Sequence, residues 1–201
     1  MGCNAARAMT FAPKLRTIAV SAVNSLRLTP RSSGAPTAGP MNTRHQFSLE
    51  KAIWDDADFA TMGWHDATLW SMLADPYSFE VLVDIDYIFE WVRPAEGEAH
   101  FKFWVAPATM VFENAADLKI NIESSQGSIE IANLHRQTIG PTPNGRLEQS
   151  AYRFECQEGE IALRATGFKL YVRQPPVLLN VQSLVLKSRG GVSFSREMND
   201  A

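Results

Sequence analysis

A stretch of alternating side chains at residues 78–92 constrains the fold of this chain more than any other feature. Every odd position from Phe79 to Trp91 is apolar, and four of the even positions are acidic. The acidic residues are Glu80, Asp84, Asp86 and Glu90. A side-chain period of two is typical of a β-strand with two chemically different faces. We therefore predict a long strand with its odd face in the core and its even face acidic and solvated.

The length and composition indicate one globular domain. The chain has 201 residues, of which 45% are hydrophobic and 20% charged, which suits a single substantial core. No apolar run approaches eighteen residues, so we expect no transmembrane helix and no membrane partner. Residues 41–130 hold 16 acidic and 5 basic residues. Such an acidic body argues against nucleic acid as a partner, because nucleic-acid grooves need clustered Lys and Arg.

The composition changes sharply at Met41. Residues 29–40 are rich in Pro, Gly, Ser, Thr and Ala, and residues 1–40 contain five basic and no acidic side chains. We favour translated upstream sequence with Met41 as the working start; an organelle transit peptide and a secretory signal are the alternatives. The predicted organisation is a disordered or non-native extension at 1–40 and a single antiparallel β domain at 41–201.

The body predicts an all-β fold with minor α content. Ser48 is a suitable N-cap for a short N-terminal helix over residues 48–62, and the remainder alternates in short runs separated by turn residues. Pro107 interrupts one run, which indicates an edge position or a bulge. The short connections exclude parallel βαβ units, so we predict an antiparallel meander that forms a sandwich or a half-barrel. The expected strands cover residues 68–73, 78–92, 99–113, 118–122, 128–135, 152–156, 161–165, 168–173, 181–186 and 192–195.

The cysteines and short motifs assign no catalytic residue, metal or cofactor. Cys156 falls on the apolar side of a strand pattern, and we interpret it as a buried free thiol, which suits a reducing, cytoplasmic location. Cysteine and histidine spacings do not match a zinc site, and neither a G-x-S-x-G elbow nor a Gly-rich phosphate loop occurs.

The candidate binding residues are His65, Asp66, Asp84, Asp86 and Glu90. Asp84 and Asp86 lie two apart on one strand face, and with a histidine nearby they could bind a divalent cation or share acid–base work. If the first strand pairs antiparallel with the long one, however, His65 lies nearer Glu90 than Asp84. A solvated acidic face is therefore favoured over a partner-binding face, and both over a metal or catalytic site. The basic residues late in the chain are expected to pair with these acidic strands: Lys169, Arg173, Lys187, Arg189 and Arg196.

Three segments carry a resemblance to other proteins. The sequence Trp-His-Asp-Ala-Thr-Leu at 64–69, the long strand, and the run at 103–113 resemble a group of small uncharacterised bacterial β-meander proteins with a Trp-His-Asp entry motif. Similar His-Asp openings occur in some immunity proteins of toxin systems. The resemblance covers roughly residues 53–194 and implies a binding role with no transferable active site.

Two functional hypotheses follow. The favoured one is a bacterial, cytoplasmic, non-enzymatic β-domain acting by protein–protein contact, as an immunity-like or accessory protein, through its acidic face or by strand addition. The alternative is a metal-assisted hydrolase or small-ligand binder that uses His65, Asp66, Asp84 and Asp86. Self-association through an open strand edge is a further expectation, while the sequence identifies neither the partner or ligand nor the oligomeric state.

Overall fold

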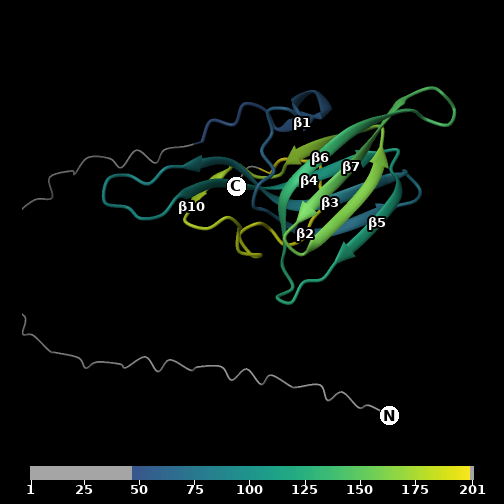
Figure 1. Cartoon of the computed structure of the whole chain (residues 1–201). Coiled ribbons are helices and arrows are strands. Elements are labelled where there is room, and N and C mark those ends of the chain that lie inside the picture. Colours follow the sequence, from purple (N-terminus) through teal and green to yellow (C-terminus); the bar gives the residue numbers. More distant parts are fainter. Residues whose placement is uncertain (1–46, 200–201) are drawn as a thin grey trace, which may run out of the picture. The chain divides into compact units, whose positions relative to one another are not determined.

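The described residues, 47–199 of a computed structural model, form one open antiparallel β-sheet (Figure 1). The predicted extension at 1–40 lies outside them. The strands are β1 (Ile53–Asp55), β2 (Ala67–Asp75), β3 (Glu80–Val92), β4 (Lys102–Glu113), β5 (Ala116–Ile122), β6 (Ile129–Pro141), β7 (Glu148–Cys156), β8 (Gly159–Ala165), β9 (Gly167–Val172) and β10 (Val177–Leu179). The all-β antiparallel prediction is confirmed. No helix in this part of the chain is long and apolar enough to cross a membrane.

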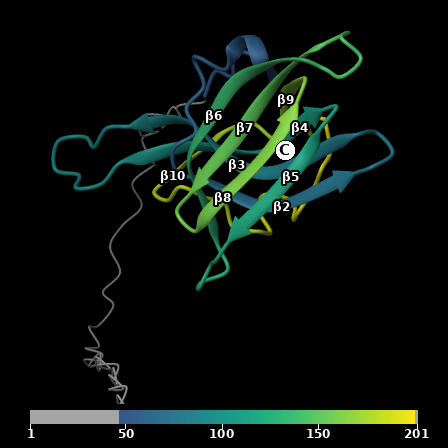
Figure 2. The same ribbon diagram turned by 45° about the vertical axis from the view of Figure 1, so that its right-hand side comes forward.

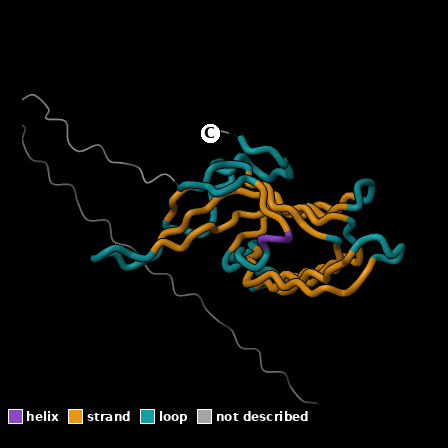
Figure 3. Tube along the Cα trace, turned by 90° about the horizontal axis from the view of Figure 1, so that it is seen from above, coloured by secondary structure: helices purple, strands orange, loops and turns teal. Residues whose placement is uncertain are grey.

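The strand order is β1-β9-β4-β3-β2-β6-β7-β8-β5, and β10 pairs with the remaining part of β4. Two meanders, β2-β3-β4 and β6-β7-β8, therefore lie side by side (Figure 2). β5 connects them in the sequence but lies at the far edge of the sheet, where it pairs with β8. Seen from above, the strands form two layers (Figure 3). The layers belong to one curled sheet, because the strand pairing is continuous. They pack against each other: the ring centroid of Phe112 in β4 lies 5.0 Å from that of Tyr152 and 5.6 Å from that of Phe154 in β7.

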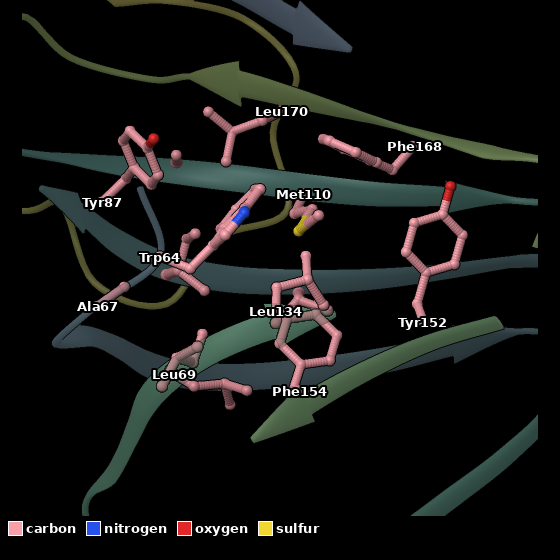
Figure 4. Packing of buried hydrophobic residues seen from close by; sticks show 14 of the residues in the cluster. Trp64, Ala67, Leu69, Tyr87, Met110, Leu134, Tyr152, Phe154, Phe168 and Leu170 are labelled. Carbon is pink, nitrogen blue, oxygen red and sulfur yellow. The ribbon is translucent and has the colours of Figure 1, made fainter. Parts of the chain in front are cut away.

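The inner face of the curled sheet holds the main core. Val81, Val83, Ile85 and Tyr87 of β3 are at most 5% exposed, so the predicted apolar odd face is confirmed over this stretch. They pack with side chains of β2, β4, β6, β7 and β9, and Trp64 enters this cluster from the segment before β2 (Figure 4). Alternating apolar side chains on every strand stabilise this layer by removing apolar surface from water.

The even face of β3 is also buried, which corrects the prediction of a solvated acidic face. Asp84 and Asp86 have no exposed surface. The chain after β10 covers them as an irregular segment, residues 180–199, which we call the C-terminal strap. Leu184 of the strap packs with Ile88 and Phe103 in a second, smaller core. Period two revealed the two faces of β3, but it could not show that a segment a hundred residues later covers the second one.

The predicted N-terminal helix is wrong. Residues 53–55 form β1 against β9, and a single 3-10 turn, η1 (Asp56–Asp58), follows. The carboxylate of Asp55 accepts a hydrogen bond from the backbone N–H of Ala57, and that of Asp58 accepts one from the N–H of Asp55, both at 2.9 Å. These acidic side chains satisfy the backbone locally and favour a turn over a longer helix.

The strands expected at residues 181–186 and 192–195 are also absent, because both stretches belong to the strap. Pro107, expected at an edge or bulge, instead lies inside β4. On one side of β4, β10 pairs with Phe103–Val105 and β9 with Ala108–Glu113, so Pro107 falls between the two partners. Its carbonyl accepts a hydrogen bond from the N–H of Arg173 at 2.9 Å. The missing N–H therefore faces a gap in the pairing, where no ladder bond is lost.

Cys156 is a buried free thiol, as predicted. Burial, with a smaller contribution from the charge of Glu158, raises its pKa from about 9 to about 11. Because only the thiolate reacts, we expect Cys156 to be roughly 100-fold less reactive at pH 8 in the folded chain than in the unfolded chain. Reaction with a chromogenic disulfide should show this in a Cys3→Ser variant, in buffer and in urea. Equal rates under the two conditions would contradict the burial of this side chain.

Candidate functional site

The five predicted site residues fall into separate places. Asp84 and Asp86 lie under the C-terminal strap, while His65 and Asp66 lie in the turn before β2. Glu90 is exposed near the end of β3 and lines a small cavity of about 320 Å³ together with His65 and Trp91. The expectation that antiparallel pairing places His65 near Glu90 is thus confirmed. The structure does not bring His65 together with the two buried aspartates.

Asp84 and Asp86 form a closed network with two arginines. Arg189 donates from Nη1 to Asp84 at 2.9 Å and from Nε to Asp86 at 3.0 Å. Arg173, which follows β9, also pairs with Asp84. Both arginines are at most 3% exposed. The predicted pairing of late basic residues with early acidic strands is confirmed for Arg173 and Arg189, and Lys169–Glu113 and Arg196–Glu80 add two pairs nearer the surface. Lys187 has no such pair among residues 47–199, so the prediction is wrong for this residue.

Backbone and indole groups satisfy the remaining acceptors of this network. The N–H of Leu184 donates to Asp86 at 2.8 Å, and that of Ser193 donates to Asp84 at 3.0 Å. Trp70 donates to Asp86 at 2.9 Å, and its ring lies 4.7 Å from the guanidinium carbon of Arg189. Burial lowers the pKa of Arg189, but its bonds to Asp84 and the charge of Asp86 outweigh this, so the pKa is raised.

This network leaves the two aspartates no role as metal ligands. Their oxygens already accept bonds from guanidinium, indole and backbone donors, so a cation would have to displace the arginines. Among residues 47–199, no group of three or more His, Cys, Asp or Glu side chains is placed to hold a metal ion. We conclude that Asp84 and Asp86 hold the strap on the sheet.

His65 and Asp66 pair with each other. Asp66 is 7% exposed and adopts a left-handed backbone conformation, φ 63°, which an Asp tolerates better than most residues. Its carboxylate contacts the Nδ1 of His65 and accepts a hydrogen bond from the side chain of Gln182 in the strap at 2.6 Å. The His65 ring packs edge-on against Trp91 with centroids 5.7 Å apart. Both side chains of this pair therefore have side-chain partners.

Glu130 of β6 is the acidic residue that sequence reasoning missed. It lies opposite Thr68 in the β2–β6 register and is half-buried beside Asp66. Its carboxylate has no hydrogen bond or ion pair with a basic side chain of the described chain. Burial raises the pKa of Glu130, and the charges of Asp66 and Glu158 raise it further. Only the pairing of β2 with β6, which are far apart in the sequence, could have revealed that Glu130 lies beside Asp66.

Glu130 lines a cavity of about 770 Å³, which we call the large cavity. Four segments enclose it: the start of β2, the end of the β3–β4 hairpin, the loop between β5 and β6, and the start of the strap. Trp70, Phe101 and Phe103 supply aromatic walls, and no Lys or Arg lines it. Its size lies in the range of small-molecule and side-chain pockets.

Comparison with protein-family models, with curated proteins and with solved structures finds no match. The resemblance to small bacterial β-meander proteins therefore stays a prediction. The site must be interpreted from its own geometry.

Replacing Arg189 tests the buried network. We expect Arg189→Met to lower the free energy of unfolding by about 3–5 kcal/mol, because it leaves Asp84 and Asp86 buried with too little compensating charge. Urea unfolding followed by Trp fluorescence measures this change. Arg196→Met, which breaks an exposed pair with Glu80, is the matched control and should cost no more than about 1 kcal/mol. Equal losses in the two variants would contradict the role given to Arg189.

Proposed function

We propose that this protein is a non-catalytic binding protein that docks a partner protein where the β3–β4 hairpin leaves the sheet. The observation that carries the proposal is the aromatic docking surface, defined as Trp91, Phe101 and Phe103. Trp91 and Phe101 are 41% and 42% exposed, whereas Phe103 is 8% exposed and supports them from below while lining the large cavity. The hairpin extends away from the curled sheet in both Figures 1 and 2, and the exposure of Trp91 and Phe101 leaves them accessible among the described residues.

The aromatic side chains are held in place before any partner arrives. The Trp91 ring packs edge-on against Phe101 at 5.9 Å and against Phe103 at 5.0 Å, and His65 contacts it as well. Rigid, partly exposed aromatic groups are typical of the residues that contribute most to protein–protein binding energy, because little side-chain freedom is lost on association. This favours a binding role over an accidental exposure of single side chains.

The charge around this surface indicates a basic partner segment. The hairpin carries three acidic side chains, Glu90, Glu96 and Glu98, against two basic ones, Arg93 and Lys102, and Glu130 adds another acid in the adjacent cavity. Within the hairpin, Lys102 already pairs with Glu98. The proposal keeps the charge complementarity expected from the sequence but moves it from Asp84 and Asp86 to these residues. A cytoplasmic setting remains part of the proposal, supported by the buried free thiol of Cys156.

The alternative of a metal-assisted hydrolase is not carried forward. Two of its four residues, Asp84 and Asp86, are engaged by arginines, and the remaining two do not form a metal-binding group within the described chain. The other part of this alternative, a small-ligand binder, keeps one supporting feature, the cavity beside Glu130.

A photo-reactive benzoylphenylalanine in place of Phe101 tests the docking surface in native cells. We expect one covalent adduct, identified by mass spectrometry as a single protein. With that protein purified, Trp91→Ala should weaken binding by at least about 30-fold in calorimetry, since truncated hot-spot aromatics typically cost about 2 kcal/mol or more. Phe79 is the control, because it is 65% exposed and lies immediately before the start of β3, at the end of that strand away from the hairpin.

The same photo-reactive group at Phe79 should give no such adduct, and Phe79→Ala should change the affinity by less than about twofold, as expected for a side chain outside the interface. An absence of adducts at Phe101, the same adduct from both positions, or unchanged binding by Trp91→Ala would overturn the proposal.

A further inference from the structure

The large cavity has a carboxylate but no resident cation. Among residues 47–199, its lining contains one acidic residue, Glu130, and one titratable base, His100. Asp84 and Asp86, on the same sheet face two strands away, are matched by two arginines, whereas the half-buried carboxylate of Glu130 has no basic partner among residues 47–199. A partly buried carboxylate without a counter-charge is unfavourable, and a cation entering the cavity would relieve it.

The acidic groups around Glu130 increase this demand for a cation. Asp66 lies next to it, and Glu158 in the β7–β8 turn accepts a hydrogen bond from the backbone N–H of Glu130 at 2.9 Å. Burial is the main reason that the pKa of Glu130 is raised, and both neighbouring carboxylates act in the same direction while His65 acts against them.

The other walls suit an organic cation rather than a hydrated metal ion. Trp70, Phe101 and Phe103 present aromatic rings, which attract a guanidinium or ammonium group that lies over a ring face. Trp70 already stacks against the guanidinium of Arg189 on the strap side. The remaining polar lining offers neutral acceptors for several N–H groups: Gln126, Ser128, Asn180, Gln182 and Ser183. Guanidinium has five such donors in a fixed plane.

The cavity also adjoins the aromatic docking surface, because Phe101 and Phe103 belong to both. Resting on the function proposed above, we infer that this cavity receives an arginine or lysine side chain of the docked partner, with Glu130 as its counter-ion. Glu130 would make an ion pair in a partly desolvated setting, while the aromatic rings pack along the aliphatic part of the side chain.

The inference predicts a defined pH dependence. A cation binds only to the ionised carboxylate, so binding weakens as the pH falls through the raised pKa of Glu130. Several other titratable groups face this carboxylate: Asp66 and His65 before β2, Glu158 from the β7–β8 turn, and His100 from the hairpin. Protonation of either histidine adds a competing positive charge and therefore weakens binding in the same direction.

Small probes test the cavity without a known partner. N-acetyl-arginine amide and N-acetyl-lysine amide are titrated into the full chain at pH 5 to 8, and binding is followed by NMR shifts of the Trp indole groups. We expect binding of the arginine probe to exceed that of the neutral isostere N-acetyl-citrulline amide by at least about tenfold, as for a charge-assisted pair. Free putrescine serves to distinguish a small polyamine from a side chain.

The variants separate binding from folding. Glu130→Gln should weaken the arginine probe at least about tenfold while leaving the melting temperature equal or higher, because it removes an unpaired, partly buried charge. Glu160→Gln, on the outer side of β8, is the matched control: it loses only an exposed pair with Arg153 and should leave binding of the arginine probe unchanged. Gln126→Arg, in the exposed β5–β6 loop, offers the cavity an internal cation and should block the probe even if Glu130→Gln does not fold.

Three results would overturn the inference. They are equal binding of the citrulline and arginine probes, unchanged binding after both Glu130→Gln and Gln126→Arg, and tight binding of putrescine without binding of the arginine or lysine probes. If Phe101 captures a partner but the probes do not bind, the docking proposal stands and the cation site fails. If the probes bind but Phe101 captures nothing, the cavity still selects cations, whereas the partner side chain as their source is ruled out.

Discussion

The network of Arg173 and Arg189 with Asp84 and Asp86 is the interaction on which the outer half of this structure depends. It lies in the middle of the sheet, with all four side chains at most 3% exposed. Removing one partner of such a network is far more costly than its net contribution to stability, because the remaining charges stay buried. The pairing therefore fixes where the strap lies more than how stable the domain is. A strap of irregular backbone has no ladder to set its register, and here the backbone N–H groups of Leu184 and Ser193 find their acceptors in the same two carboxylates.

The position of the strap in turn shapes the cavity. Residues 180–183 form one wall, and Gln182 reaches from that wall to hold Asp66. Trp70 connects the two regions, since it donates to Asp86, stacks on Arg189 and lines the cavity. A change in the buried network would thus be transmitted to the cavity through one indole and one segment of main chain. This arrangement explains how a fold without helices of regular length can still hold a preformed pocket on the outside of its sheet.

Local patterns predicted the inner half of the molecule and missed the outer half for one reason. The alternation of Val81, Val83 and Ile85 identifies a core face because the sheet itself imposes the period. The burial of Cys156 follows equally from nearby residues. In contrast, the burial of Asp84 depends on Arg173 and Arg189, which lie 89 and 105 positions further along the chain. Arg189 belongs to the strap, whose sequence has no periodic pattern. Sequence reasoning did pair the late basic residues with the early acidic ones, yet it assumed solvated strands, because antiparallel sheets commonly leave one face in water.

The same comparison shows why Glu130, and not the acidic pair that first drew notice, is the residue to examine for function. A polar face that the chain itself has covered should have its charges compensated, and Asp84 and Asp86 meet this condition completely. Glu130 lies on the same sheet face, two strands away through β2, and is half-buried without any compensating base in the described chain. A fold that matches two of its buried acids so fully, and leaves a third facing an aromatic cavity, has an unmet electrostatic demand at one place only in that face. A cation supplied by another molecule would satisfy it, and the open hairpin beside the cavity gives that molecule a surface on which to bind.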